Sequence, residues 1–172
     1  MGGRSELFVV VMAAFVAALL TIAVYYIARA RRADSWSVLL RRLKRLDRDN
    51  IATIAGDHDF SIDPERISAM IGGMEGLEAL EANCAVLIDL ACYVQRWYPE
   101  AVVVAEELRL NAREIQWHLG RLKGTTSAQS LKENFSDYAH PAVSIYYTMT
   151  CLLLKLYEKG NLPGLRELQR AI

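Results

Sequence analysis

The sequence predicts an all-α protein, with one N-terminal transmembrane helix followed by a cytoplasmic bundle of about five or six helices. Three observations support this prediction. Residues 7–28 form one long apolar run, residues 34–172 repeat apolar side chains at helical spacing, and no stretch shows the apolar–polar alternation of a half-buried strand. We expect four parts: a short extracytoplasmic tail (1–6), a transmembrane helix (7–28), a basic juxtamembrane connector with an amphipathic helix (29–56) and an acidic helical-bundle domain (57–172).

The N-terminal apolar segment, LFVVVMAAFVAALLTIAVYYIA, has the length of a membrane-spanning helix. As a helix it would extend ~33 Å, which matches the ~30 Å hydrocarbon core of a bilayer. A cleaved signal peptide has a positively charged start, a shorter apolar region and a cleavage site with small residues. Here Arg4 is balanced by Glu6, and arginines follow the apolar run. We therefore expect an uncleaved anchor.

The residues that follow this segment predict its orientation and its boundary. Arg29, Arg31 and Arg32 come directly after it, whereas the preceding flank holds only Arg4. Because Lys and Arg next to a span are retained on the cytoplasmic side, we expect the N-terminus outside and the C-terminal domain in the cytoplasm. Aromatic side chains favour the depth of the lipid headgroups, and flanking cations anchor there as well. Six residues are assigned to this interface: Tyr25, Tyr26, Arg29, Arg31, Arg32 and Trp36.

The connector holds much of the positive charge of the chain. Residues 29–48 contain eight Lys or Arg against two Asp, a net charge of +6, whereas residues 49–172 carry a net charge of −6. Asp34 and Ser35 are suited to cap a helix, and Gly56 is suited to end it. Between this cap and Gly56, apolar residues recur at helical spacing. The cations of this predicted basic amphipathic helix are Arg41, Arg42, Lys44, Arg45 and Arg48.

Two environments for this basic helix stay open. It would lie on anionic lipid, where each Lys or Arg near the surface is worth ~1 kcal/mol, or it would pack its leucines on the bundle with its arginines in solvent. Binding to nucleic acid would require interleaved aromatic residues or a known DNA-binding frame, and neither is present. We therefore predict no nucleic-acid partner.

The acidic domain is predicted to consist of helices separated by polar breaks. Asp63 and Pro64 form a typical helix start, and the glycines within residues 72–76 predict a kink or break. Pro141 is expected to separate a short helix from a strongly apolar one that forms the bundle core. The expected helices cover residues 64–98, 100–123, 130–140, 142–157 and 164–172.

No recognised catalytic or metal-binding motif is present in the sequence. Glu114 and His118 lie one helical turn apart and are weak metal candidates. A carboxylate-bridged dimetal bundle would also need the same motif on a second helix and two further glutamates. The loop at residues 57–59, Asp-His-Asp, favours turn and capping chemistry over cation binding. We therefore predict no metal and no cofactor.

Two further features of the domain are interpreted as structural. Cys84, Cys92 and Cys151 lie in apolar helical stretches and are odd in number, which favours buried thiols over a disulfide framework. Asp89 lies within an apolar run, so it is expected to need an arginine partner. The spacing suggests Arg96 or Arg113.

The anchor, the charge separation and the absence of a motif favour a non-catalytic protein. We predict a single-pass, membrane-anchored interaction or scaffold module with a cytoplasmic helical domain. Its partners would be the lipid bilayer and another protein, bound through the helical body or the transmembrane helix. An accessory subunit of a larger integral membrane complex is the alternative, since small side chains allow spans to pack closely; these are Ala13, Ala14, Ala17 and Ala18. A membrane-anchored metal-binding protein or enzyme is the third hypothesis.

Overall fold

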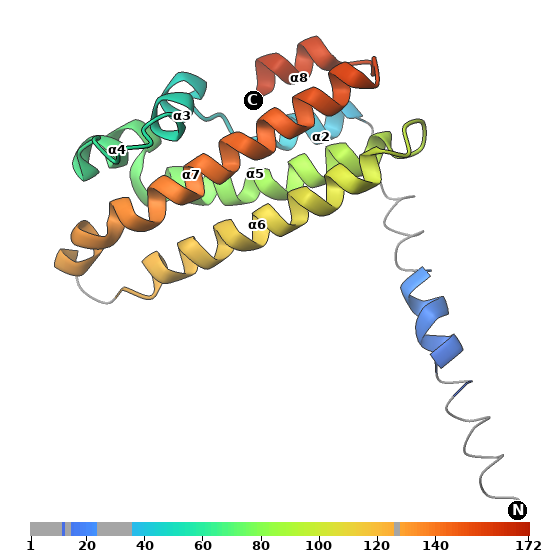
Figure 1. Ribbon diagram of the computed structural model, residues 1–172, viewed down its shortest axis with the longest axis horizontal. Coiled ribbons are helices and arrows are strands. Elements are labelled where there is room, and N and C mark those ends of the chain that lie inside the picture. Colours follow the sequence, from blue (N-terminus) through green and yellow to red (C-terminus); the bar gives the residue numbers. More distant parts are fainter. Residues whose placement is uncertain (1–11, 13–14, 24–35, 126–127) are drawn as a thin grey trace, which may run out of the picture. The chain divides into compact units, whose positions relative to one another are not determined.

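The computed structural model describes residues 12, 15–23, 36–125 and 128–172, and the chain divides into two units, Met1–Asp34 and Ser35–Ile172 (Figure 1). In the first unit, residues 15–23 are helical. Most of the predicted transmembrane segment lies outside the described residues, as do Tyr25, Tyr26, Arg29, Arg31 and Arg32. Within the described part of the chain, no helix combines the length and the apolar character needed to cross a membrane.

The second unit is helical, and its described residues contain no strand, which confirms the all-α prediction. Seven helices are described between Trp36 and Ala171, rather than five or six. They are α2 (Trp36–Arg42), α3 (Arg48–Ala55), α4 (Pro64–Ile71), α5 (Gly73–Val94), α6 (Ala101–Lys123), α7 (Ala128–Lys159) and α8 (Leu165–Ala171).

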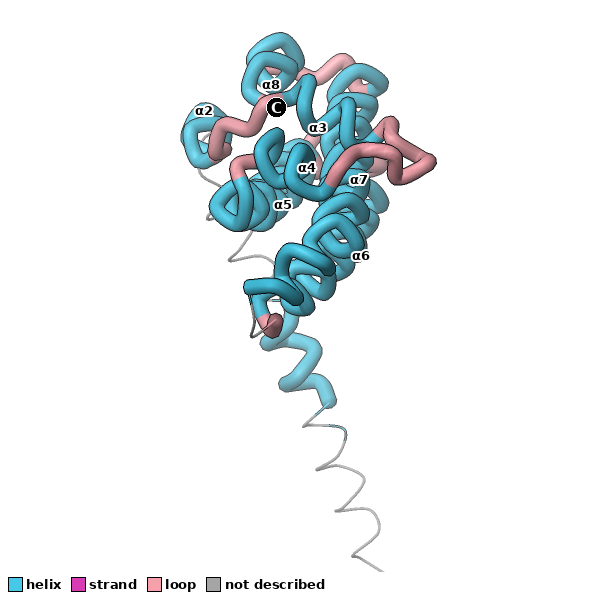
Figure 2. The backbone as a smooth tube through the Cα atoms, turned by 90° about the vertical axis from the view of Figure 1, so that its left-hand side faces the viewer, coloured by secondary structure: helices cyan, strands magenta, loops and turns pink. Residues whose placement is uncertain are grey.

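The long helices α5, α6 and α7 run side by side and build the core (Figures 1 and 2). Helix α7 contacts α3, α4, α5, α6 and α8, while α2 packs on α5. The predicted position of the apolar segment 142–157 at the bundle centre is confirmed, because Val143, Met149, Leu153 and Tyr157 are fully buried.

The start of α4 and the break after it follow the sequence signals. Asp63 caps α4, since its carboxylate accepts a hydrogen bond from the Glu65 N–H at 2.8 Å, and Pro64 occupies the first turn. Gly72 ends α4 in the left-handed region with φ 86°, a conformation that glycine adopts without a Cβ penalty. The predicted break within residues 72–76 is therefore confirmed.

The prediction of one continuous connector helix is wrong, because residues 43–47 separate α2 from α3. The buried side chain of Asn83 on α5 supplies the reason. Its Oδ1 accepts a hydrogen bond from the Lys44 N–H at 2.8 Å, and its Nδ2 donates to the Lys44 carbonyl at 2.9 Å. Asp47 then caps α3 by accepting from the Asn50 N–H at 3.0 Å. The backbone groups that would continue the helix are satisfied by these side chains instead.

The predicted helix boundary at Pro141 is also wrong, because α7 continues through it. A proline inside a helix removes one N–H donor and crowds the preceding turn, at a cost of about 3 kcal/mol. The residues on both sides of it are buried: Ala139, His140, Ala142 and Val143. Burial of this stretch offsets much of the local cost, since full burial of Val143 alone contributes about 1.5–3 kcal/mol.

Candidate functional site

The five cations of the connector fall on three short pieces of structure. Arg41 and Arg42 end α2, Lys44 and Arg45 lie in the linker, and Arg48 begins α3. All five side chains are exposed. The connector leucines lie on the opposite side, where Leu39 is buried and Leu40, Leu43 and Leu46 pack against the core. The apolar side of the connector therefore belongs to the bundle, and its cations face solvent.

Trp36 is tied to the bundle. Its Nε1 donates a hydrogen bond to the Tyr157 hydroxyl at 3.0 Å, and that hydroxyl donates to the Leu90 carbonyl at 3.3 Å. Its ring also packs against Gly164, where a Cβ would overlap the indole. Arg42 adds a second link, because its guanidinium lies 3.3 Å from the Asp89 carboxylate on α5. The helical spacing had suggested other arginines for Asp89.

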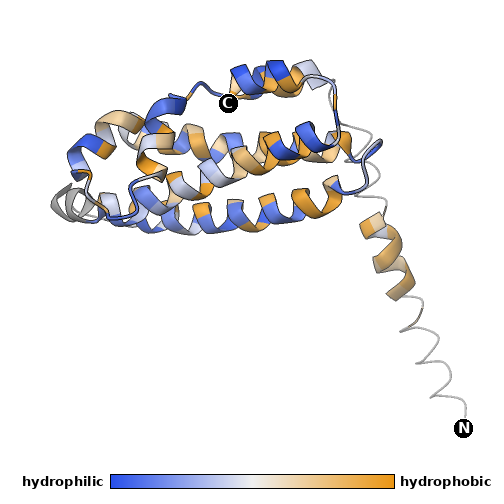
Figure 3. Cartoon of the chain, turned by 45° about the horizontal axis from the view of Figure 1, so that its top comes forward, coloured by the Kyte–Doolittle hydropathy of each residue, from blue (hydrophilic) through white to orange (hydrophobic). Residues whose placement is uncertain are grey.

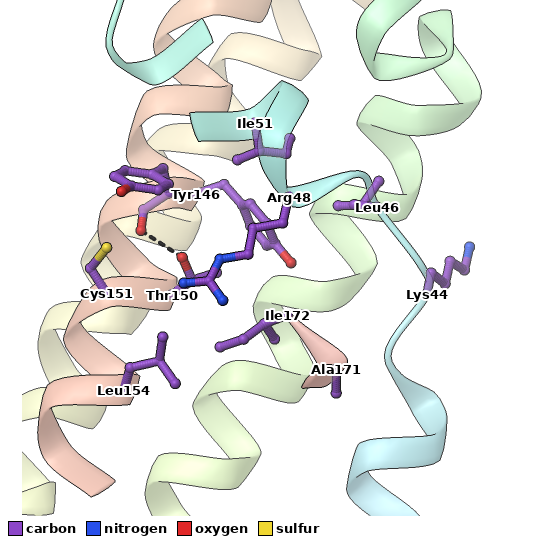
Figure 4. A pocket seen from close by; sticks show the side chains of 11 residues that line it. Lys44, Leu46, Arg48, Ile51, Tyr146, Thr150, Cys151, Leu154, Ala171 and Ile172 are labelled. Atoms are coloured by element: carbon purple, nitrogen blue, oxygen red, sulfur yellow. Dashed lines mark hydrogen bonds between the residues drawn. The ribbon is translucent and has the colours of Figure 1, made fainter. Parts of the chain in front are cut away.

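A small pocket lies between the connector, α7 and α8 (Figure 4). The Arg48 side chain extends over the pocket toward Thr150, and Leu154 and Ile172 form part of the apolar lining of the pocket. The Arg48 guanidinium also donates to the Gln169 carbonyl at 3.4 Å, a long hydrogen bond. The pocket can present a cation to a small anion, but its small size makes it a weak ligand site.

Besides Arg48, the titratable side chains that line this pocket are Lys44, Tyr146, Tyr147 and Cys151. None of its side chains is a carboxylate or an imidazole, the groups that most often serve as the base beside a nucleophile. The Thr150 hydroxyl donates to the Tyr147 carbonyl at 2.7 Å. Burial raises the pKa of Tyr146 to about 12, against the opposing effect of the hydrogen bond from Asn83. The Tyr146 hydroxyl therefore keeps its proton near neutral pH.

Glu114 and His118 do not form a metal site with further ligands. Glu114 is exposed, and no group of three or more potential metal-binding side chains occurs in the described residues. The His118 ring instead contacts Trp117, with 4.9 Å between centroids, and lies 6.1 Å from Tyr138. Burial lowers the pKa of His118, and the nearby Glu114 charge partly opposes this. His118 is one member of an aromatic cluster.

Asp57 organises the loop between α3 and α4, which confirms the capping interpretation. Its carboxylate accepts hydrogen bonds from the Ser61 hydroxyl at 2.6 Å, the Ser61 N–H at 3.0 Å and the Ile62 N–H at 2.9 Å. It also lies 4.0 Å from Nε2 of the buried His140, and the Phe60 ring packs on His140 at a tilt of 37°, with centroids 4.4 Å apart. These hydrogen bonds lower the pKa of Asp57, and the bond from the Ser61 hydroxyl has the largest effect.

The outer face of α6 exposes a row of large apolar side chains that the sequence analysis missed. Val103, Leu110 and Trp117 are 70%, 62% and 53% exposed. They are seven residues apart, so they lie one above another on one side of the helix. The opposite side of α6 is buried along its length through Ala105, Leu108, Ala112, Ile115 and Leu119. We call these three exposed residues the α6 row.

The α6 row differs from the other exposed surface of the helix, where polar side chains dominate. In the hydropathy colouring of Figure 3, hydrophobic residues recur along α6 and gather at its start. Single exposed apolar residues are common in proteins, whereas an aligned set of large ones is a candidate interaction surface. The seven-residue spacing was the available signal. Comparison of this chain with known protein families, curated proteins and solved structures found no match, so its function is inferred from this geometry.

Proposed function

We propose that this chain is a single-pass, membrane-anchored interaction module without catalytic activity, whose helical domain lies at the cytoplasmic face and docks a protein through the α6 row. The observation that carries the proposal is the alignment of Val103, Leu110 and Trp117 on the side of α6 that faces away from the core. Burying these side chains against a partner would remove a large apolar area from water, at roughly 25 cal/mol for each Å².

The membrane anchor is proposed from the sequence. Residues 7–28 are apolar over a length suited to a bilayer, and arginines follow at once. The exposed cations of the connector support the same proposal, because positive charge next to a span is attracted to anionic lipid. The connector leucines pack on the bundle, so an attraction to lipid would act through charge and not through an inserted apolar face.

The anchor is tested by extracting membranes from cells that express the full chain. Alkaline carbonate releases peripheral proteins and leaves integral ones in the membrane pellet. We expect the wild-type chain in the pellet, and a variant with Leu19→Arg and Leu20→Arg in the soluble fraction. Recovery of the wild-type chain in the carbonate supernatant would refute the anchor.

Docking through α6 is tested by cross-linking with an amine-reactive reagent in intact membranes. We expect the full chain to enter cross-linked complexes, and Leu110→Asp to reduce their amount several-fold, since a carboxylate in an apolar contact must be desolvated. Gln116→Asp is the matched control, because Gln116 is exposed on the same helix but outside the α6 row. Equal cross-linking of the two variants, with equal melting temperatures, would exclude the α6 row as the docking surface.

A further inference from the structure

The α6 row is arranged so that two copies of it match each other in the antiparallel direction. Leu110 lies midway between Val103 and Trp117, seven residues from each. We propose that the α6 row binds the α6 row of a second copy of this chain, with the two helices antiparallel and Leu110 of each copy at the centre. This inference rests on the proposed docking function and names its partner.

The apolar residues fit this arrangement by size. A two-fold axis next to Leu110 brings Leu110 of both copies together and places Val103 of each copy opposite Trp117 of the other. A small side chain then faces a large one at both ends, which fills the contact evenly. A parallel pair would instead oppose the two tryptophans at one end and the two valines at the other, and the helices would diverge.

The charges beside the row favour the same direction. Glu106 and Arg113 flank the row on one side, and Glu107 and Glu114 flank it on the other, with Glu100 and Arg121 further along. In the antiparallel pair, Glu106 lies next to Arg113 of the second copy, and Glu100 lies next to Arg121 of the second copy. Glu107 next to Glu114 is the one unfavourable pairing.

A parallel pair has a poorer balance of charges. It would place Glu106 next to Glu107 of the second copy, which is repulsive, and Arg113 next to Glu114, which is attractive. The antiparallel pair thus gains two kinds of attractive contact against one repulsive contact, while the parallel pair gains one of each. Because exposed charge pairs add little affinity but discriminate between orientations, they select the direction of a contact driven by the apolar row.

The contact is small, so it is expected to be weak in dilute solution. The row spans 15 residues, or ~21 Å of helix from Val103 to Trp117, and contacts of this size fall below the area of stable interfaces. The proposed anchor would hold the copies in one membrane, and such confinement raises the effective concentration of each copy for the other. The association is therefore best measured in the membrane, with a reaction that captures transient contacts.

Disulfide capture in membranes that contain the full chain tests the pairing. On oxidation with copper phenanthroline, we expect Leu110→Cys to form covalent dimers several-fold faster than the matched control Gln116→Cys. The wild-type chain gives the background from its native cysteines, of which Cys84 is buried and Cys92 and Cys151 are partly exposed. Equal rates for the two variants would overturn the proposal.

The direction is tested by co-expressing Val103→Cys and Trp117→Cys chains with different tags. An antiparallel pair gives mainly mixed dimers of the two variants, and a majority of Val103→Cys homodimers would overturn the antiparallel arrangement. The result also separates this inference from the proposed function. If Leu110→Cys captures no second copy but Leu110→Asp still reduces the amine cross-linked complexes, the row docks a partner other than a second copy. If neither variant has an effect, the proposed docking function fails as well.

Discussion

Asn83 on α5 holds the main chain of Lys44 in the connector through both of its amide atoms. Oδ1 accepts from the Lys44 N–H at 2.8 Å, and Nδ2 donates to the Lys44 carbonyl at 2.9 Å. The second hydrogen of Nδ2 is directed to the Tyr146 hydroxyl, at 3.2 Å. One buried side chain therefore joins the connector to α5 and α7 at the point where the basic segment leaves its first helix.

Removal of this amide should destabilise the domain strongly. Asn83→Ala leaves the N–H and carbonyl of Lys44 without these partners, so we expect the free energy of unfolding to fall by about 2–4 kcal/mol. Urea denaturation measures the change. Asn111→Ala is the control, because Asn111 is half-exposed on α6, and it should alter stability by less than about 0.5 kcal/mol. Similar losses for both variants would contradict the role of Asn83.

Two glycines in helices should respond to alanine in opposite ways. A Cβ at Gly76 would overlap the carbonyl oxygen of Ile71 and lie 2.7 Å from its carbonyl carbon, whereas a Cβ at Gly120 would meet nothing within 4 Å. We expect Gly76→Ala to destabilise by more than about 2 kcal/mol, and Gly120→Ala to stabilise by about 0.5–1 kcal/mol. Thermal unfolding of the pair provides the measurement, and a neutral Gly76→Ala would refute the close approach of α5 to the end of α4.

Alkaline pH should destabilise the domain through two buried tyrosines. Burial raises the pKa of Tyr146 and of Tyr157 to about 12, from an ordinary value of 10.0. Both hydroxyls keep their protons in the folded state at a pH where they ionise in the unfolded chain. The stability that they contribute is therefore complete below pH ~10 and is lost as pH rises toward ~12, by about 2 kcal/mol for each tyrosine.

Urea denaturation between pH 9 and 12 measures this loss, and tyrosinate absorbance reports the ionisation directly. We expect Tyr146→Phe to be less stable than the wild-type chain near neutral pH, because it loses the contact with Asn83, but to lose less further stability as pH rises. A pH slope for Tyr146→Phe equal to that of the wild-type chain would show that this hydroxyl ionises in the folded state.

Acid should weaken the loop that Asp57 holds. Hydrogen bonds from the Ser61 hydroxyl, the Ile62 N–H and the Ser61 N–H, together with His140, lower the pKa of Asp57 below 3.8. The stability from this carboxylate is thus present above pH ~3.8 and is lost as pH falls through the folded-state pKa. We expect Asp57→Asn to lower Tm at pH 7, and the difference from the wild-type chain to shrink below pH 4. Asp59 is exposed in the same loop, so Asp59→Asn should leave Tm unchanged both at pH 7 and below pH 4.

Helix starts and stops that depend on local chemistry could be predicted from the sequence. Asp63 and Pro64 begin α4, and Gly72 ends it, because a cap, a first-turn proline and a left-handed glycine act within a few residues. The break in the connector and the passage of α7 through Pro141 could not be predicted in this way. Both are decided by groups distant in sequence, which are the Asn83 amide and the segments against which the stretch around Pro141 is buried.

The same distinction applies to the candidate sites. The spacing of the connector separated its cations from its leucines, but the contact of Asp57 with His140 joins residues 83 positions apart and has no local signature. The α6 row was visible as a seven-residue repeat. A repeat alone does not tell which side of a helix faces the core, and the contacts of α6 with α5 and α7 decide that.

The position of α7 in the chain also affects how the domain is made. Five other helices pack against α7, yet it starts only at Ala128. During synthesis, α3 to α6 leave the ribosome before the helix that covers their apolar faces exists. Nascent chains that stop before Ala128 should therefore be sensitive to protease and bind chaperones, and the domain should acquire its resistance abruptly, once residues through Lys159 have emerged.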